Sequence, residues 1–171
     1  PPACPAAPKD WWSASPELDR AIAERFGATH ARLALGEGVS WRATADGRLA
    51  EIIVLDQFSR QLFRGDTRAF AQDGMALVLA QEAVAGGFDR TLSTDRRAFL
   101  YMPFMHSESL LVHELARPLM AALGGDYAKS ARGHFEVLTR FGRYPKRNTA
   151  LGRASTPEEL AYIAESGGSM F

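Results

Sequence analysis

The chain has few of the features that cross-link small proteins or anchor proteins in membranes. Cys4 is its only cysteine, so no disulfide can form within the chain, and a reducing cytoplasm is the compartment we expect. No apolar run approaches the roughly 18 residues of a membrane span. The first ten residues also lack the basic start and apolar core of a signal peptide. We therefore expect a soluble protein with no membrane partner.

An excess of charge of either sign is also absent. The 20 basic residues balance the 20 acidic ones, so the counterion release that drives nucleic-acid binding is small, and we do not expect a nucleic-acid partner. The length of 171 residues fits one domain, and the hydrophobic content of 46% is enough for a core. We predict a disordered or extended segment over residues 1–10, because it is rich in Pro and Ala, and a single helical domain over residues 11–171.

Metal and phosphate-loop motifs are missing. The four histidines are not arranged as H-E-x-x-H, no cysteine pair exists, and no Glu stands three residues before a histidine. Glycine-rich phosphate loops and the G-x-S-x-G elbow of many hydrolases are absent as well. We therefore expect neither a metal nor a cofactor.

Helix signals are frequent, whereas alternating β-branched segments bounded by hairpin turns are not found. Ser15-Pro16 is an N-cap followed by proline in the first turn, and Thr156-Pro157-Glu158-Glu159 is a capping box. Pro103 is expected to end or kink a helix, and Asp73 and Ser107 are expected to cap helices. The sequence predicts an all-α array of about seven helices, over residues 16–35, 45–65, 73–85, 95–102, 108–123 and 126–141 and from 157 onward.

Charge interrupts an apolar helix in the second of these segments. Four aliphatic residues, 52–55, precede Asp56, Arg60 and Arg64, which are spaced i, i+4, i+8 and so share one stripe. A helix that is apolar on every side is buried, so its polar stripe faces a partner or a ligand. Two interpretations remain open: an internal ion pair between Asp56 and Arg60 that fixes packing, or a ligand site that also uses Gln57.

Titratable residues gather where the predicted helix breaks near Pro103. Histidine is the side chain best suited to proton transfer near neutral pH, so His106 could act as a general acid or base. Ser107 and backbone N–H groups at a new helix start could hold an anion, with Glu108 beside them. The alternative is that Ser107 is only a cap, Glu108 suits the positive helix end and His106 is a packed residue.

A basic loop follows the sixth predicted helix. Between residues 136 and 158 the chain has no acid, and Pro145 and two aromatic residues stiffen the segment. Arg143, Arg147 and Asn148 there could grip a carboxylate or phosphate. The alternative is a solvated loop whose arginines satisfy the ends of neighbouring helices.

Three motifs together carry a resemblance to a known family. Residues 55–65 (LDQFSRQLFRG), 101–109 (YMPFMHSES) and 141–148 (FGRYPKRN) followed by 151–153 (LGR) resemble family 924 of the bacterial domains of unknown function, in order from about Trp11 to the C-terminus. The resemblance implies an all-helical, tetratricopeptide-like array and no established activity or cofactor. This chain departs from the family pattern at Gln61, usually Asn, and at Lys146, commonly His.

Two functions follow as hypotheses. The first is a partly buried polar pocket for a small anionic molecule that could support acid–base, hydrolase-like chemistry. Its expected catalytic residues are Asp56, His106 and Glu108, and its expected ligand-binding residues are Gln57, Arg60, Arg64, Ser107, Arg143, Arg147 and Asn148. The second is a non-enzymatic scaffold that holds an acidic peptide or protein partner on the basic loop and on an apolar seat of Met102, Phe104 and Met105.

Overall fold

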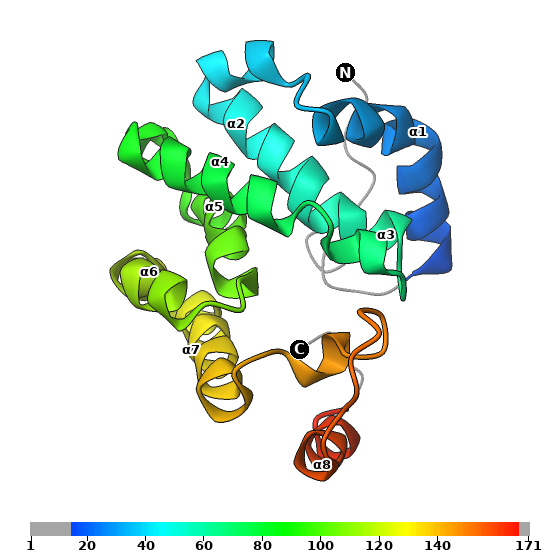
Figure 1. Cartoon of the computed structure of the whole chain (residues 1–171). Coiled ribbons are helices and arrows are strands. Elements are labelled where there is room, and N and C mark those ends of the chain that lie inside the picture. The colour runs from blue at the N-terminus through cyan, green and yellow to red at the C-terminus, as the bar shows by residue number, and fades with distance from the viewer. Residues whose placement is uncertain (1–14, 168–171) are drawn as a thin grey trace.

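The computed structural model of the chain describes residues 15–167. Within this range it consists of α-helices and short helical turns, with no strand, as Figure 1 shows. The all-α prediction is therefore confirmed, whereas the tetratricopeptide-like arrangement and the single-domain boundary stay predictions. The segment expected to be disordered, residues 1–10, lies outside the described residues. The helices are α1 (Pro16–Ala34), α2 (Ala45–Ile53), α3 (Ser59–Leu62), α4 (Asp73–Ala85), α5 (Thr94–His106), α6 (Leu110–Leu123), α7 (Gly125–Phe141) and α8 (Pro157–Glu165).

The helix ends that the sequence marks most clearly form as expected. The Ser15 hydroxyl accepts a hydrogen bond from the Leu18 amide, at 3.3 Å, and caps α1. At α8 the Thr156 hydroxyl accepts from the Glu159 amide while the Glu159 carboxylate accepts from the Thr156 amide, which completes the capping box. Gly142, with φ of 69°, ends α7 in the left-handed conformation that glycine adopts without strain.

The helix predicted over residues 45–65 is interrupted. After α2 the backbone widens into a π-helical turn, Val54–Phe58, before the short α3 resumes and ends at Leu62. A π turn holds more residues than an α turn, so a strict i, i+4, i+8 stripe does not continue through it. The predicted helix end at residue 65 was wrong, because Phe63 leaves the helical conformation and α3 ends at Leu62, before Arg64.

Three other predicted helix ends differ from the structure. Pro103 does not end α5, which continues to His106, because Met102 and Phe104 on either side are buried in the core and hold the helix together. Ser107 therefore ends α5, and Ser109 is the N-cap of α6. Asp73 is the first residue of α4 after the N-cap Gln72, and its side chain is used elsewhere.

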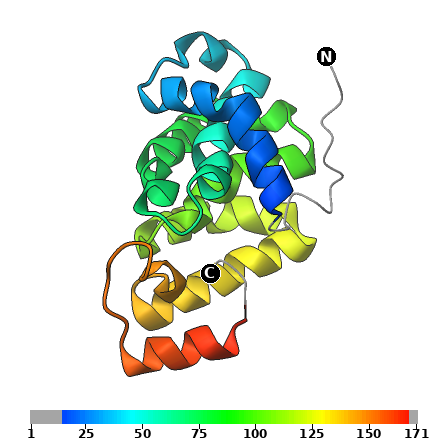
Figure 2. The same ribbon diagram turned by 90° about the vertical axis from the view of Figure 1, so that its right-hand side faces the viewer.

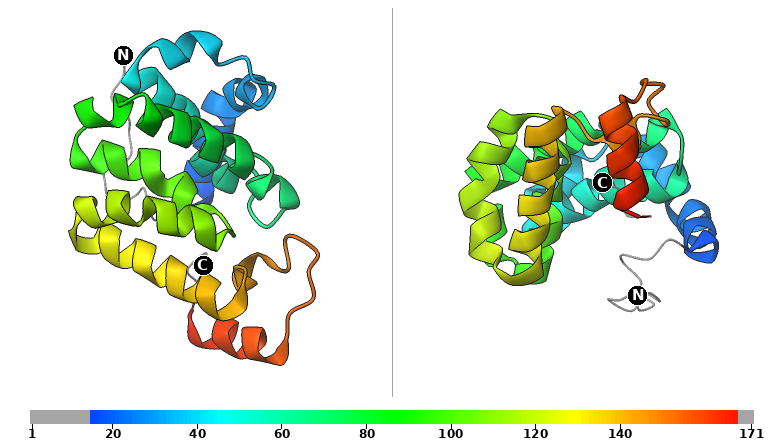
Figure 3. Two further views of the ribbon diagram at one scale, coloured as in Figure 1. Left: turned by 60° about the vertical axis from the view of Figure 1, so that its left-hand side comes forward. Right: turned by 90° about the horizontal axis from the view of Figure 1, so that it is seen from below.

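The core lies between α2, α4 and α5, where Ile52, Leu55 and Leu100 have no exposed surface. Successive helices α4, α5, α6 and α7 pack on one another, as the left view of Figure 3 shows. Helix α8 lies beside the C-terminal end of α7 and is joined to it by the loop of residues 142–156 (Figure 2). In the described residues, no helix has the length and apolar character required to cross a bilayer.

Candidate functional site

Five charged or titratable side chains from five elements of the chain meet below the surface. Asp56 comes from the π turn, Arg60 from α3, Asp73 from the first turn of α4, His106 from the end of α5 and Arg147 from the turn after Tyr144. We call these five residues the buried ion cluster. Four of them were predicted as site residues, and the structure brings them together although they span 91 positions from Asp56 to Arg147.

Asp56 is fully buried and its carboxylate is held on every side. The Nδ1–H of His106 donates to its Oδ1 at 2.7 Å, and the Gln57 amide donates to its Oδ2 at 2.5 Å. The Arg60 guanidinium lies 3.6 Å away. Burial alone would raise the pKa of Asp56, but His106, Arg60 and Gln57 more than offset this effect and hold the pKa below its usual value.

Arg60 joins this carboxylate to that of Asp73. An Nη of Arg60 lies 2.8 Å from Asp73 Oδ1, and the other Nη donates to the carbonyl of Ala69. Burial raises the pKa of Asp73, and its two arginine neighbours offset only part of that effect. The ion pair considered between Asp56 and Arg60 is present, and Asp73 shares the same guanidinium.

Arg147 is 7% exposed, yet it is weakly paired. In the part of the chain that the structure describes, Asp73 is its only carboxylate contact, at 3.4 Å and through a single Nη. Its Cζ lies over the rings of Tyr144, at 4.5 Å, and Phe70, at 4.9 Å. Burial lowers the pKa of Arg147, and the positive charge of Arg60 adds to that effect.

Two side chains of the buried ion cluster are partly exposed to solvent. The side chain of Asp73 is 21% exposed and that of His106 is 11% exposed. Since Nδ1 of His106 donates to Asp56, Nε2 is the ring nitrogen that can accept a proton. The His106 ring also lies 6.2 Å from the ring of His134, whose pKa burial lowers to about 3, so that His134 stays neutral beside it.

A second network holds the loop of residues 142–156 in place, and it contains three residues predicted to be functional. Glu108 accepts two hydrogen bonds from Arg153, at 2.6 and 2.9 Å, and one from the Tyr144 amide at 2.7 Å. Arg143 donates twice to Glu159, at 2.6 and 2.8 Å. Asn148 donates to the same carboxylate, at 3.2 Å, and accepts from Arg153. Glu108, Arg143 and Asn148 therefore orient the loop that carries Arg147.

The two remaining predicted residues, Arg64 and Ser107, make their hydrogen bonds outside the buried ion cluster. Arg64 forms a two-point ion pair with Asp19 on α1, at 2.8 and 2.9 Å, and the structure does not bring it to the cluster. The Ser107 carbonyl accepts a hydrogen bond from Nε2 of His113, at 3.0 Å. Tyr144 donates its hydroxyl to the Met105 carbonyl, at 2.6 Å, which ties the basic loop to the end of α5.

Sequence reasoning did not identify three residues of the site: Asp73, Phe70 and Tyr144. Asp73 resembled a helix cap, and the two aromatic residues gave no signal beyond the loop stiffness noted for Tyr144. In the sequence, nothing distinguishes Asp73 from an ordinary acid at a helix start. Among the described residues, no group of histidine, cysteine and acidic side chains is arranged to hold a metal ion.

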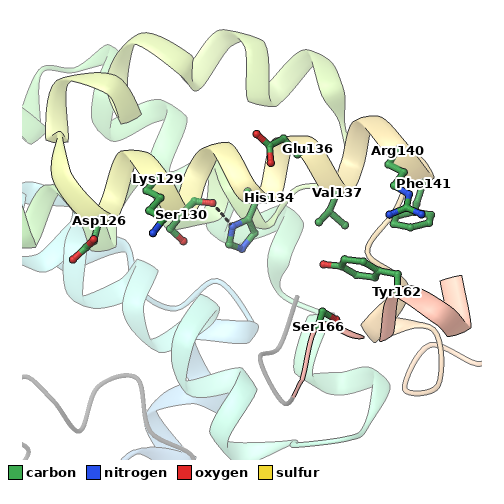
Figure 4. A pocket seen from close by; sticks show the side chains of 11 residues that line it. Asp126, Lys129, Ser130, His134, Glu136, Val137, Arg140, Phe141, Tyr162 and Ser166 are labelled. Carbon is green, nitrogen blue, oxygen red and sulfur yellow. Dashed lines mark hydrogen bonds between the residues drawn. The ribbon is translucent and has the colours of Figure 1, made fainter. Parts of the chain in front are cut away.

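A groove of about 730 Å³ runs along α7 and faces α8, as Figure 4 shows. Its walls include Phe141 and Tyr162, whose rings are 5.1 Å apart, and His134 points into it from α7. Asp56, Arg60 and Arg147 do not line this groove. It approaches the buried ion cluster through His134, next to His106.

The comparisons with known proteins agree with this fold. The sequence matches the family described as "Bacterial protein of unknown function (DUF924)" over residues 3–167. The structure is similar to that of a protein of unknown function from Agrobacterium tumefaciens, with a TM-score of 0.89 and 38% sequence identity over 94% of this chain and 91% of that chain. No curated protein matches the chain. Since the family match covers nearly the whole sequence, the chain belongs to the DUF924 family of bacterial proteins.

Proposed function

We propose that the buried ion cluster binds a small oxyanion, a carboxylate or phosphate, and that His106, oriented by Asp56, transfers a proton at the bound molecule. In this proposal Arg147 receives the anion and His106 is the acid or base. Asp56 is a positioning residue because both of its oxygens are already engaged by protein groups.

The observation that carries the proposal is that Arg147 has N–H donors left over after its contact with Asp73. A guanidinium has five N–H donors in a planar fork, and a two-point pair with an oxyanion would use them. Arg147 is 7% exposed, and Asp73, its one carboxylate contact among residues 15–167, lies closer to Arg60, at 2.8 Å, than to Arg147, at 3.4 Å. A small anion at the open edge of Arg147 would supply the missing charge and accept the remaining donors.

The orientation of His106 supports the acid–base part. A carboxylate that accepts from Nδ1 fixes the ring tautomer and stabilises the positive charge that forms when Nε2 takes a proton. Asp56 is placed for both tasks at 2.7 Å. With its side chain 11% exposed, His106 is the member of this pair that a ligand or water can reach.

The scaffold alternative loses part of its support in the structure. Met102 and Phe104, two of the three residues expected to form an adaptable apolar seat, are 2% and 5% exposed and belong to the interior. They are therefore not available to a peptide. The geometry favours the small-molecule site.

Thermal unfolding with added inorganic phosphate or acetate tests the proposal. At about ten times its Kd, a ligand of the folded state adds roughly 1.4 kcal/mol, which raises Tm by about 3–5 °C for a chain of this size. We expect this shift for the wild type with at least one of the two anions. It should be lost in Arg147→Ala and reduced in Arg147→Lys, which keeps the charge without the planar fork.

Arg140→Ala is the matched control. Arg140 is an exposed arginine that pairs with Glu158, at 2.9 Å, and stacks on Phe141. This variant should respond to the anion as the wild type does. If neither anion shifts the wild type, or if Arg147→Ala responds in full, the proposal is wrong.

A further inference from the structure

The outward face of α6 is apolar to an unusual degree. Leu111 and Leu115 are 69% and 64% exposed, and Leu110 is 43% exposed. Surface leucines that occur singly are ordinary, but three within one and a half helical turns form a continuous patch. The opposite side of α6 packs on α5 and α7. We call the outward residues the α6 face: Leu110, Leu111, Glu114, Leu115, Arg117, Pro118, Ala121 and Ala122, all of which are exposed.

Side-chain size changes along this face. Its N-terminal half carries the leucines, and its C-terminal half carries Pro118, Ala121 and Ala122. Two such helices cannot pack evenly in parallel, because large residues would meet large ones and small would meet small. In an antiparallel pair centred on the middle of the face, Leu110 and Leu111 of each helix lie over the small residues near Ala121 of the other, while the two Leu115 side chains meet at the centre.

The charges on the α6 face also favour an antiparallel pair of helices. Its charged residues are Glu114 and Arg117, which lie one turn apart and approach to 3.3 Å within the helix. A twofold axis that passes between them places Glu114 of each copy opposite Arg117 of the other. Interfaces with twofold symmetry require a patch that is complementary to itself, and the α6 face meets this condition in both size and charge.

We propose that the α6 face is the contact between two copies of this chain, with the two α6 helices antiparallel about a twofold axis between Glu114 and Arg117. A shallow groove of about 190 Å³ between α6 and α7 borders the face and is lined by Arg117, Ala121 and Arg132 among others. In this arrangement Leu111 of the second copy lies beside that groove, whose walls are otherwise mainly apolar.

The size of the face sets the strength of association. A helix of 14 residues is about 21 Å long, and two such helices bury well under the roughly 800 Å² per partner of a standard interface. The dimer should therefore exchange with monomer and depend on concentration. It should not be a permanent assembly.

Sedimentation equilibrium over about 10 µM to about 1 mM protein measures this equilibrium. We expect the wild type to shift from monomer to dimer across this range, and Leu115→Glu to remain monomeric. Leu160→Glu is the matched control, because Leu160 is 57% exposed but lies on α8. This control should dimerise as the wild type does.

Charge reversal tests the orientation without removing an apolar side chain. Glu114→Arg or Arg117→Glu alone places like charges opposite each other and should weaken the dimer about tenfold or more. The double variant Glu114→Arg/Arg117→Glu restores opposite charges and should recover most of the affinity. A wild type that stays monomeric throughout, a Leu160→Glu variant that dissociates, or a double variant no better than the singles would each overturn the proposal.

Discussion

At the scale of single residues, Asp73 links the two arginines of the buried ion cluster and leaves one of them incompletely paired. It lies 2.8 Å from Arg60 and 3.4 Å from Arg147. Asp56 is different, because protein donors saturate it. The two carboxylates therefore have different tasks. Asp56 orients His106, whereas Asp73 leaves Arg147 able to bind an anion besides Asp73 itself.

The first prediction concerns Asp56. Asp56→Asn removes the charge next to Arg60 and His106 and turns one acceptor into an N–H group that faces existing donors. Breaking a buried pair in this way costs about 3 kcal/mol, and we expect this loss in the free energy of unfolding measured in urea. NMR of the imidazole nitrogens should also show that His106 no longer holds its proton predominantly on Nδ1.

Asp19→Asn is the control for that variant. Asp19 pairs with Arg64 near the surface, so its removal should cost well under about 1 kcal/mol and leave His106 unchanged. An Asp56→Asn protein as stable as the wild type, with an unchanged His106 tautomer, would contradict the positioning role.

At the scale of elements, the features that the sequence predicted correctly are local. The caps at Ser15 and Thr156 and the stop at Gly142 depend on residues within one turn, and these helix ends were predicted. The π turn at Val54–Phe58 and the continuation of α5 past Pro103 depend on packing against distant segments. Residues close in sequence contain no information on such packing, so these features were missed.

The capping box of α8 gives the second prediction. Thr156→Ala removes the hydroxyl that accepts from the Glu159 amide and should cost about 1 kcal/mol locally. Amide hydrogen exchange in α8 should therefore become about fivefold faster. Thr139→Ala, which removes a hydroxyl within α7 that donates to the Phe135 carbonyl, should leave exchange in α8 as it is. Equal exchange in α8 of Thr156→Ala and the wild type would show that the cap does not hold this helix.

At the scale of the whole molecule, three buried histidines link stability to pH. Burial lowers the pKa of His134 from 6.5 to about 3, and it lowers the pKa of His30 and of His113 as well. The unfolded chain takes up protons below about pH 6.5 while folded His134 does not. The stabilisation is therefore complete above about pH 6.5 and is lost progressively as the pH falls toward the folded pKa.

The loss of stability at low pH gives the third prediction. Between about pH 7 and about pH 5, His134 alone should lower the free energy of unfolding by about 2 kcal/mol, with smaller losses from His30 and His113. Urea unfolding at the two pH values measures the loss, and His134→Phe should show it reduced by about half or more. A wild type of equal stability at both pH values, or a His134→Phe variant with the full loss, would contradict the assignment.

The sequence identified most residues of the buried ion cluster, but it did not show how they pair. Asp56, Arg60, His106 and Arg147 stood out because charge interrupts apolar or aromatic segments. Their pairing through Asp73, which is 74 positions from Arg147, depends on the tertiary fold. The same holds for Glu108, Arg143 and Asn148, since only the folded chain shows that each is engaged by a neighbour in the loop network.

The π turn before α3 makes the length of this segment as important as its composition. Each residue of an α-helix turns the chain by about 100°, so losing a single residue from Val54–Phe58 would rotate everything that follows by that angle. Arg60 would then swing away from Asp73 although no cluster side chain had been altered. The segment should thus tolerate exchanges of its apolar residues far better than a shortening by one, and relatives that share the cluster should share the insertion.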